Sequence, residues 1–276
     1  MGPGLFSCLG LKNSKKPSPV LPTIKSKNQE KESSPPEVDQ TVHGAVLVEL
    51  FSSQGCATSQ QAEMMVSRIG RGDFELDVPV ILLAFHVDYW DHLGWKDPYG
   101  SNQWTVRQKS YVEALEVDTL FTPHVVVQGR VQCLGNDQDD VLYNITSAIR
   151  FPGPAFKATF QRTPPDSLQV TLTGPLRIIV DNDSADVMVA LYENSLVTDC
   201  PEGENKGRIL SSDYAVRSLK KMCTVREISA EKILIGSVTF GLWEGFNSGK
   251  CGVVVFVQNK SLQILGSQNI SEMENV

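Results

Sequence analysis

The start of the fold is decided by residues 45–56, Ala45-Val46-Leu47-Val48-Glu49-Leu50-Phe51-Ser52-Ser53-Gln54-Gly55-Cys56. Residues 45–51 are apolar almost without interruption, which is typical of a strand buried on both faces of a sheet. After Cys56, apolar residues recur at the spacing of one helix face: Ala62, Met65, Val66 and Ile69. The pattern therefore predicts a buried strand that passes into a helix at Cys56.

A cysteine at the beginning of a helix has an expected reactivity. Free backbone N–H groups and the helix dipole favour the thiolate, so the thiol pKa is expected to fall. A second interpretation remains, in which Cys56 is a small buried residue that packs as a hydrophobe. The sequence leaves both interpretations of Cys56 open.

Further strands and helices follow in a regular order up to residue 150. A second buried strand is predicted at residues 78–86, and a loop rich in aromatic and acidic residues at 87–98. A helix with Trp104 and Tyr111 on one face comes next, then Thr122-Pro123 before a strand at 125–127, a short strand at Cys133 and a closing helix. This order predicts an α/β domain over residues 44–150.

The strand-end Cys56, Thr122-Pro123 before a strand, and the final hairpin and helix resemble the thioredoxin superfamily. In that superfamily the proline is cis, lies beside the active-site cysteine and exposes a backbone edge that pairs with substrate. The resemblance implies catalytic roles for Cys56, Ser59 and Pro123 and a substrate-binding role for Thr122. Ser59 stands where a dithiol site has its second cysteine, so an adduct on Cys56 would need an outside thiol for its release.

Three segments more narrowly resemble a family known as domain of unknown function 1223: residues 48–56, residues 86–98 and Thr122-Pro123. The resemblance covers about residues 46–266 and adds His86, Asp88 and Trp90 as expected substrate-binding residues. Many bacterial members have a second cysteine followed by two prolines and an export signal. This chain has Ser59 and two glutamines at those positions, and no recognisable signal peptide.

After residue 154 the pattern changes to short strands separated by turns. Strands are predicted at residues 155–161, 168–173, 187–192, 233–243, 252–258 and 262–265, and residues 203–208 are expected to be a loop without assigned chemistry. The predicted fold class is thus an α/β thioredoxin-like domain followed by a mostly antiparallel β-sandwich domain at 151–268.

The two ends of the chain are expected to be tails. Residues 1–43 are rich in Lys, Ser and Pro and predict a disordered segment, and residues 269–276 predict a flexible C-terminal tail. Without a signal peptide the expected location is the cytoplasm. The alternatives are organelle targeting by the N-terminal tail or a lipid anchor at Cys8.

Charge argues against nucleic acid as a partner, and hydropathy argues against a transmembrane helix. The formal net charge of −7 argues against nucleic-acid binding, which needs a basic surface. The longest apolar run, residues 78–85, is far too short for a transmembrane helix. Candidate metal ligands at His86, Asp88, Asp91 and His92 lack a dedicated ligand spacing, so no metal is expected.

The six cysteines are widely scattered and predict mostly reduced thiols. The favoured function is thiol–disulfide or glutathione-linked monothiol exchange through Cys56. Its partners would be protein or peptide thiols or glutathione, and no cofactor is expected beyond glutathione as a co-substrate. The alternative is a non-enzymatic binding module that uses the same fold to hold a protein or peptide.

Overall fold

The computed structural model describes residues 44–162, 164–178, 180, 184–270 and 273. Up to residue 150 the elements follow the expected order of strands and helices. They are β1 (Val46–Ser52), α1 (Ser59–Arg71), β2 (Val80–His86), the short helix η1 (Asp91–Leu93), α2 (Asn102–Ala114), β3 (His124–Val127), β4 (Val131–Leu134) and α3 (Gln138–Thr146).

The predicted burial of β1 and of one face of α1 is confirmed. Every residue of β1 is buried, and the four apolar positions of α1 named above all lie in the core. The helix ends at Gly72, whose φ of 78° is left-handed and whose N–H reaches Ile69 O at 3.0 Å. Glycine adopts this conformation without the strain that a side chain would add, so the chain turns sharply there.

After residue 150 the regular elements of the described residues are strands, apart from one short helix. The elements are β5 (Lys157–Gln161), β6 (Ser167–Pro175), β7 (Ala185–Glu193), β8 (Leu196–Cys200), β9 (Arg208–Ser212), β10 (Ala215–Val225), β11 (Ile233–Gly241), the short helix η2 (Ser248–Lys250), β12 (Cys251–Asn259) and β13 (Ile264–Ile270).

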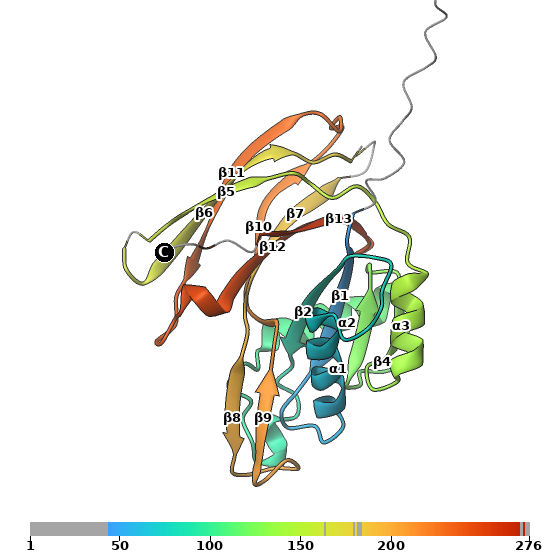
Figure 1. The fold of residues 1–276 in the computed structure, drawn as a ribbon, viewed down its shortest axis with the longest axis vertical. Helices are drawn as coiled ribbons and strands as arrows, with labels where there is room; N and C mark the ends of the chain where they lie inside the picture. Colours follow the sequence, from blue (N-terminus) through green and yellow to red (C-terminus); the bar gives the residue numbers. More distant parts are fainter. Residues whose placement is uncertain (1–43, 163, 179, 181–183, 271–272, 274–276) are drawn as a thin grey trace, which may run out of the picture. The chain divides into compact units, whose positions relative to one another are not determined.

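One mixed sheet contains strands from both parts of the chain. Its eight strands run in the order β13-β12-β7-β10-β2-β1-β3-β4 (Figure 1). The junction is a parallel contact between β2 and β10, where Ala84 lies opposite Ala215 and the Ala84 N–H donates to Tyr214 O at 2.8 Å. The sheet is therefore continuous across the position where two domains were expected to meet.

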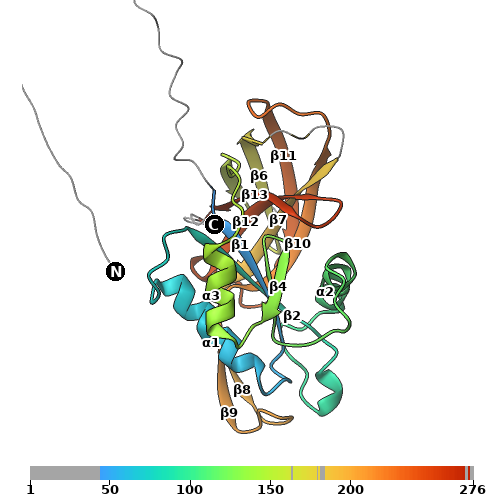
Figure 2. The same ribbon diagram turned by 90° about the vertical axis from the view of Figure 1, so that its right-hand side faces the viewer.

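Helices cover the two faces of the first part of this sheet. Helices α1 and α3 pack on one face and α2 on the other, as Figure 2 shows. The core on the α2 side also crosses the junction, because Leu47 and Phe85 share it with Val254 and Phe256 of β12. Burial of one shared apolar core couples the two parts energetically.

A second, three-stranded sheet packs over the far part of the large sheet. Its order is β11-β6-β5, all antiparallel. Leu168, Val170 and Leu172 of β6 are fully buried in a core that also contains residues of β7 and β12. The alternation expected for residues 168–173 is thus confirmed: the intervening side chains of β6 are only partly buried.

The predicted fold class, an α/β thioredoxin-like domain followed by a separate antiparallel sandwich, is wrong. The described part of the chain is mostly β, with three α-helices, and its eight-stranded mixed sheet is shared by both parts. Local strand and helix patterns carry no signal for a single strand pairing between distant segments, and the Ala84–Ala215 pairing is such a contact.

The hairpin of β8 and β9 was not predicted. Its strands pair antiparallel from Leu196–Ser212 to Cys200–Arg208, and it stands between β7 and β10 in the chain (Figure 1). Its segment contains the run expected to be only a loop, and it is too polar to show a clear strand alternation. The hairpin lies beside the N-terminal end of α1, where the functional site is found.

The N-terminal tail predicted at 1–43 lies outside the described residues. At the other end, β13 continues to Ile270 and Met273 is buried. The proposed divisions at residues 44, 151 and 269 stay predictions. Within the described residues, the helices are too short or too polar to cross a membrane.

A buried ion pair ties the two parts together beneath α2. The Arg107 Nε lies 2.6 Å from Glu49 Oε2, and the Tyr111 hydroxyl donates to Glu49 Oε1 at 2.6 Å. Gln258, at the end of β12, donates to the Tyr111 hydroxyl at 3.0 Å. Glu49 is only 1 % exposed, so its carboxylate depends on these partners for solvation.

Replacing Arg107 with Met would leave the Glu49 carboxylate buried without a counter-charge. We expect the free energy of unfolding to fall by about 3–5 kcal/mol, measured by urea denaturation at neutral pH. Arg68→Gln, which removes an exposed pair with Asp73, is the control and should change stability by less than about 1 kcal/mol. Equal losses in the two variants would contradict the buried network.

Candidate functional site

Cys56 lies in a tight turn between the end of β1 and the start of α1. Its N–H donates to Ser53 O at 3.1 Å, and the Ser59 N–H donates to Cys56 O at 3.3 Å. Cys56 is 5 % exposed, whereas its neighbours Ala57 and Thr58 are exposed. The thiol is thus held just below the surface at the N-terminal end of a helix, as the sequence predicted.

Hydroxyl groups surround the thiol. The Thr58 Oγ1 lies 3.3 Å from Cys56 Sγ, and the Ser59 Oγ accepts from Ser53 N at 3.3 Å, which leaves the Ser59 hydrogen free to donate. The Thr122 carbonyl, 3.7 Å from Sγ, can accept a hydrogen bond from the neutral thiol.

These groups decide the ionisation of Cys56. Burial opposes the thiolate, but side-chain hydrogen bonds from Ser59, Thr122 and Thr58 outweigh burial, and the pKa of Cys56 falls below its ordinary value. Ser59 therefore has a chemical role different from that of a second cysteine: it donates to the thiolate.

A carboxylate from a distant segment of the chain lies at the N-terminal end of α1. Thr58 is the cap residue, but its side chain makes no capping bond, and the first turn of α1 contains no acid. Instead, the Ala57 N–H donates to Glu204 Oε2 at 3.0 Å. A carboxylate at this position is favoured by the helix dipole and by the unpaired N–H groups.

Asn205, the next residue, clamps the Cys56 turn. It is fully buried, and its Nδ2 donates to Gln54 O at 2.8 Å and to Cys56 O at 3.2 Å. Arg208 fixes the other end of this amide by donating to Asn205 Oδ1 at 3.1 Å. The loop between β8 and β9 thus satisfies two backbone carbonyls of the turn.

The Thr122–Pro123 peptide bond is cis and lies beside Cys56, as the resemblance implied. The Trp90 indole N–H donates to Thr122 Oγ1 at 2.7 Å, which directs the Thr122 side chain. Trp90 also packs on Gly55, where an added Cβ would come within 3.0 Å of the Trp90 Cβ. Only a small residue fits at this approach between the turn and the Trp90 loop.

A buried charge cluster lies below the same turn. The His86 Nδ1 is 2.8 Å from Asp97 Oδ2, and its Nε2 is 3.4 Å from Glu63 Oε1. Ser52 also donates to Glu63, and the three charged side chains are each about 1 % exposed.

The cluster has a defined charge distribution. Burial would lower the pKa of His86, but the Asp97 and Glu63 carboxylates raise it to about 9. Burial favours a neutral Asp97, yet protonated His86 and several hydrogen bonds hold its pKa below the ordinary value. For Glu63, burial dominates and raises the pKa. At neutral pH the central pair is therefore a histidinium and the Asp97 carboxylate.

Asp97 connects this cluster to the thiol turn. The same Oδ2 that contacts His86 accepts from the Gln54 N–H at 2.8 Å. Gln54 is therefore held through its N–H by Asp97 and through its carbonyl by Asn205. The Cys56 turn is fixed from the core and from the hairpin at the same time.

A comparison with models of protein families shows which family this chain matches. The model of a family described as "Protein of unknown function (DUF1223)" matches residues 47–258. The chain belongs to the DUF1223 family. The match includes the Cys56 turn, the cis proline and the Glu204 loop, so all parts of the site lie in the family region.

Two solved structures share the fold of this DUF1223 chain. A crystal structure of a protein from Agrobacterium tumefaciens is 23% identical, with a TM-score of 0.58, over 84% of this chain and 96% of that one. HBP35 of Porphyromonas gingivalis is 14% identical, with a TM-score of 0.57, over 84% of this chain and 76% of that one. Among curated proteins no match is found.

The other residues that the sequence singled out as possible metal ligands make separate side-chain contacts. Asp88 accepts from the Thr105 hydroxyl at 2.6 Å, and His92 is exposed with its Nδ1 2.8 Å from Tyr89 O. The described residues contain no group of three or more His, Cys, Asp or Glu side chains that could hold a metal ion.

Glu63, Asp97, Glu204 and Asn205 were not recognised as site residues from the sequence. Glu63 gave one usable signal, because it is a carboxylate beside the apolar face of α1. Asp97 lay in a run that carried the family resemblance, without an assigned role. Glu204 and Asn205 lay in the run 203–208, which was expected to be a loop without assigned chemistry. Their contacts to the turn span about 150 residues, so local patterns did not indicate them.

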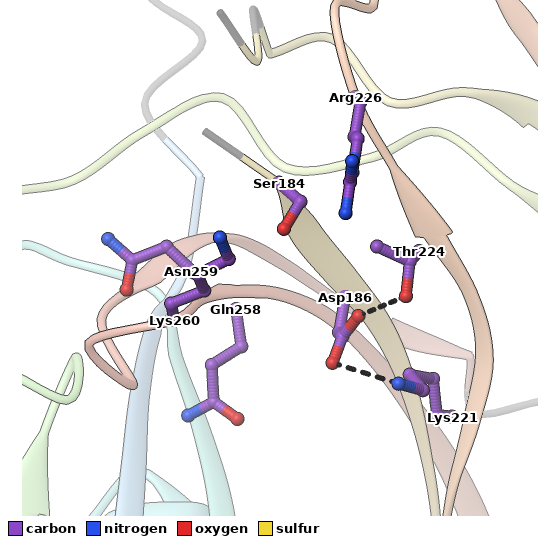
Figure 3. A pocket seen from close by; sticks show the side chains of 8 residues that line it. All are labelled: Ser184, Asp186, Lys221, Thr224, Arg226, Gln258, Asn259 and Lys260. Atoms are coloured by element: carbon purple, nitrogen blue, oxygen red, sulfur yellow. Dashed lines mark hydrogen bonds and ion pairs between the residues drawn. The ribbon is translucent and has the colours of Figure 1, made fainter. Parts of the chain in front are cut away.

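Two hollows of the described surface lie away from Cys56 in this DUF1223 chain. Figure 3 shows one of about 270 Å³, lined by Lys221, Arg226 and Lys260 among others, with Asp186 paired to Lys221 at 3.4 Å. A second, shallower hollow lies at the end of α2, near Ser110. Neither of these two hollows is lined by Cys56.

The histidinium–carboxylate pair predicts a specific dependence of stability on pH. The folded pKa of His86 is about 9, above the unfolded value of about 6.5. The stabilisation should be complete below about pH 6.5 and lost as pH rises through 9, a loss of about 3 kcal/mol. Urea unfolding from pH 6 to 10 should show this loss in the native chain.

The His86→Gln variant should lack this alkaline loss, because it has no proton to release. His92→Gln, which alters an exposed ring, serves as the matched control and should keep the native pH profile. Parallel pH profiles for the native chain and His86→Gln would show that His86 is not protonated in the folded state.

Proposed function

We propose that this chain carries out thiol–disulfide exchange as a monothiol, with Cys56 as the nucleophile. One observation carries the proposal: in the described part of the chain, Cys56 is the cysteine whose pKa is lowered. Burial raises the pKa of Cys133 to about 11 and that of Cys251 to about 12, and it also raises those of Cys200 and Cys223. At neutral pH, Cys56 therefore supplies the most thiolate.

The reaction would proceed in two exchanges. The Cys56 thiolate attacks one sulfur of a disulfide, the S–S bond breaks, and the other sulfur leaves as a thiolate. Ser59 cannot attack the resulting mixed disulfide, so a second, external thiolate must release Cys56. Proposed partners are protein or peptide thiols or glutathione, in a reducing compartment such as the cytoplasm.

The resemblance of the Cys56 and Thr122–Pro123 segments to thioredoxins supports a role for Thr122 and Pro123 in positioning substrate. The Thr122 carbonyl lies near Sγ, and Trp90 holds the Thr122 side chain. We assign His86 to the buried support of the turn, through Asp97. Asp88 supports the loop that carries Trp90, through its bond to Thr105.

A second candidate is a non-enzymatic module that binds a protein or peptide next to the cis proline. The low exposure of Cys56, 5 %, favours it, because a disulfide must approach the sulfur in line. The two candidates differ in whether Cys56 forms a covalent adduct.

Treatment with the neutral hydroxyethyl disulfide should give one adduct on Cys56 that persists after the reagent is removed. Replacing Ser59 with Cys should shorten the adduct's lifetime at least tenfold, because a thiol three residues away can attack it. Mass spectrometry of the native chain and of Ser59→Cys measures both quantities.

Cys133→Ser is the matched control and should keep the adduct, whereas Cys56→Ser should abolish it. If other cysteines react while Cys56 stays free, thiol exchange is wrong and the binding module replaces it.

A further inference from the structure

Glu204 places a negative charge beside the proposed nucleophile. Its Oε2 accepts from the N–H of Ala57, which directly follows Cys56, at 3.0 Å. The carboxylate is exposed and stands at the surface edge formed by Ala57 and Thr58. A disulfide approaching Cys56 along this edge would pass close to the charge.

The same loop also carries two exposed cations, Lys206 and Arg208. Arg208 is one contact further away, because it reaches the turn only through Asn205. Two further carboxylates, Asp88 and Asp91, flank Trp90, which packs on Gly55. Lys96 lies near Asp91 and offsets part of that charge.

We propose that Glu204 makes Cys56 selective for neutral or positively charged peptide and protein disulfides over anionic ones such as oxidised glutathione. This inference rests on the proposed function and names its substrate class. In the exchange, the Cys56 sulfur bonds to one substrate sulfur, and the other leaves as a thiolate that takes a proton from water. In this step the Glu204 carboxylate repels a substrate carboxylate that approaches Cys56 and attracts a substrate ammonium group.

The size of the effect follows from Coulomb's law in a solvent-exposed site. One charge at this range should change the rate by roughly threefold per substrate charge at low salt. The effect should largely vanish at about 0.5 M salt, where the screening length falls below the separation of the charges.

The test uses three disulfides of different charge: oxidised glutathione (anionic), hydroxyethyl disulfide (neutral) and cystamine (cationic). The rate of Cys56 adduct formation is measured for the full native chain and for Glu204→Gln. Glutamine keeps an acceptor for the Ala57 N–H but removes the charge. Each rate is compared between variant and native chain, so differences in intrinsic disulfide reactivity cancel.

Glu204→Gln should raise the rate with oxidised glutathione by about threefold or more relative to hydroxyethyl disulfide, and lower the rate with cystamine by a similar factor. All three disulfides react with the same thiol, so a change in the Cys56 pKa caused by the substitution cancels when the rates of two probes are divided. Glu202→Gln, in the same exposed loop, is the control and should leave the ratios within about 1.5-fold. In the native chain, raising the salt concentration to about 0.5 M should shift the ratios in the same direction as Glu204→Gln, because salt screens the Glu204 charge.

Probe ratios that stay unchanged in Glu204→Gln, or that do not respond to salt in the native chain, would overturn the charge selection alone. The absence of any Cys56 adduct with the neutral disulfide would overturn the proposed function itself. The two failures are therefore distinguishable.

Discussion

The parallel contact between β2 and β10 decides where the other parts of this protein lie. At this contact Ala84 lies opposite Ala215, and the Ala84 N–H donates to Tyr214 O at 2.8 Å. Both alanines are fully buried, so this pairing lies inside the core. Because β10 begins here, the β8–β9 hairpin that precedes it emerges beside the ends of β1 and β2. Those are the ends that carry Cys56 and His86.

Two supports then meet at a single residue of the turn, Gln54. Asp97 accepts the Gln54 N–H from the core side, and Asn205 donates to the Gln54 carbonyl from the hairpin side. Both supporting side chains are buried, and a buried polar group that loses its partner costs about 1–3 kcal/mol. The turn is thus held in one conformation, which keeps Sγ within reach of the surrounding hydroxyls. A preorganised site of this kind stabilises charge without rearrangement.

Local patterns predicted much of this structure. The apolar run of β1, the stripe of α1 and the turn at Cys56 follow from periodicity, because each depends on neighbours within one or two helical turns. The cis Thr122–Pro123 bond beside Cys56 followed from family resemblance. The shared sheet did not, since Ala84 and Ala215 are ordinary buried alanines in sequence. The charge cluster below the turn was also missed. His86 was expected to bind substrate, and its partners Glu63 and Asp97 could be recognised only once the helix and the loop pack against it.

The central claim is that hydroxyl groups outweigh burial and lower the pKa of Cys56 below its ordinary value. The most direct measurement is the pKa of each thiol, obtained from the pH dependence of iodoacetamide alkylation with peptide mapping by mass spectrometry. The account predicts a Cys56 pKa below the ordinary cysteine value of about 8.5, and below those of Cys133 and Cys251, whose pKa values burial raises to about 11 and about 12. A Cys56 pKa at or above the ordinary value would contradict the account.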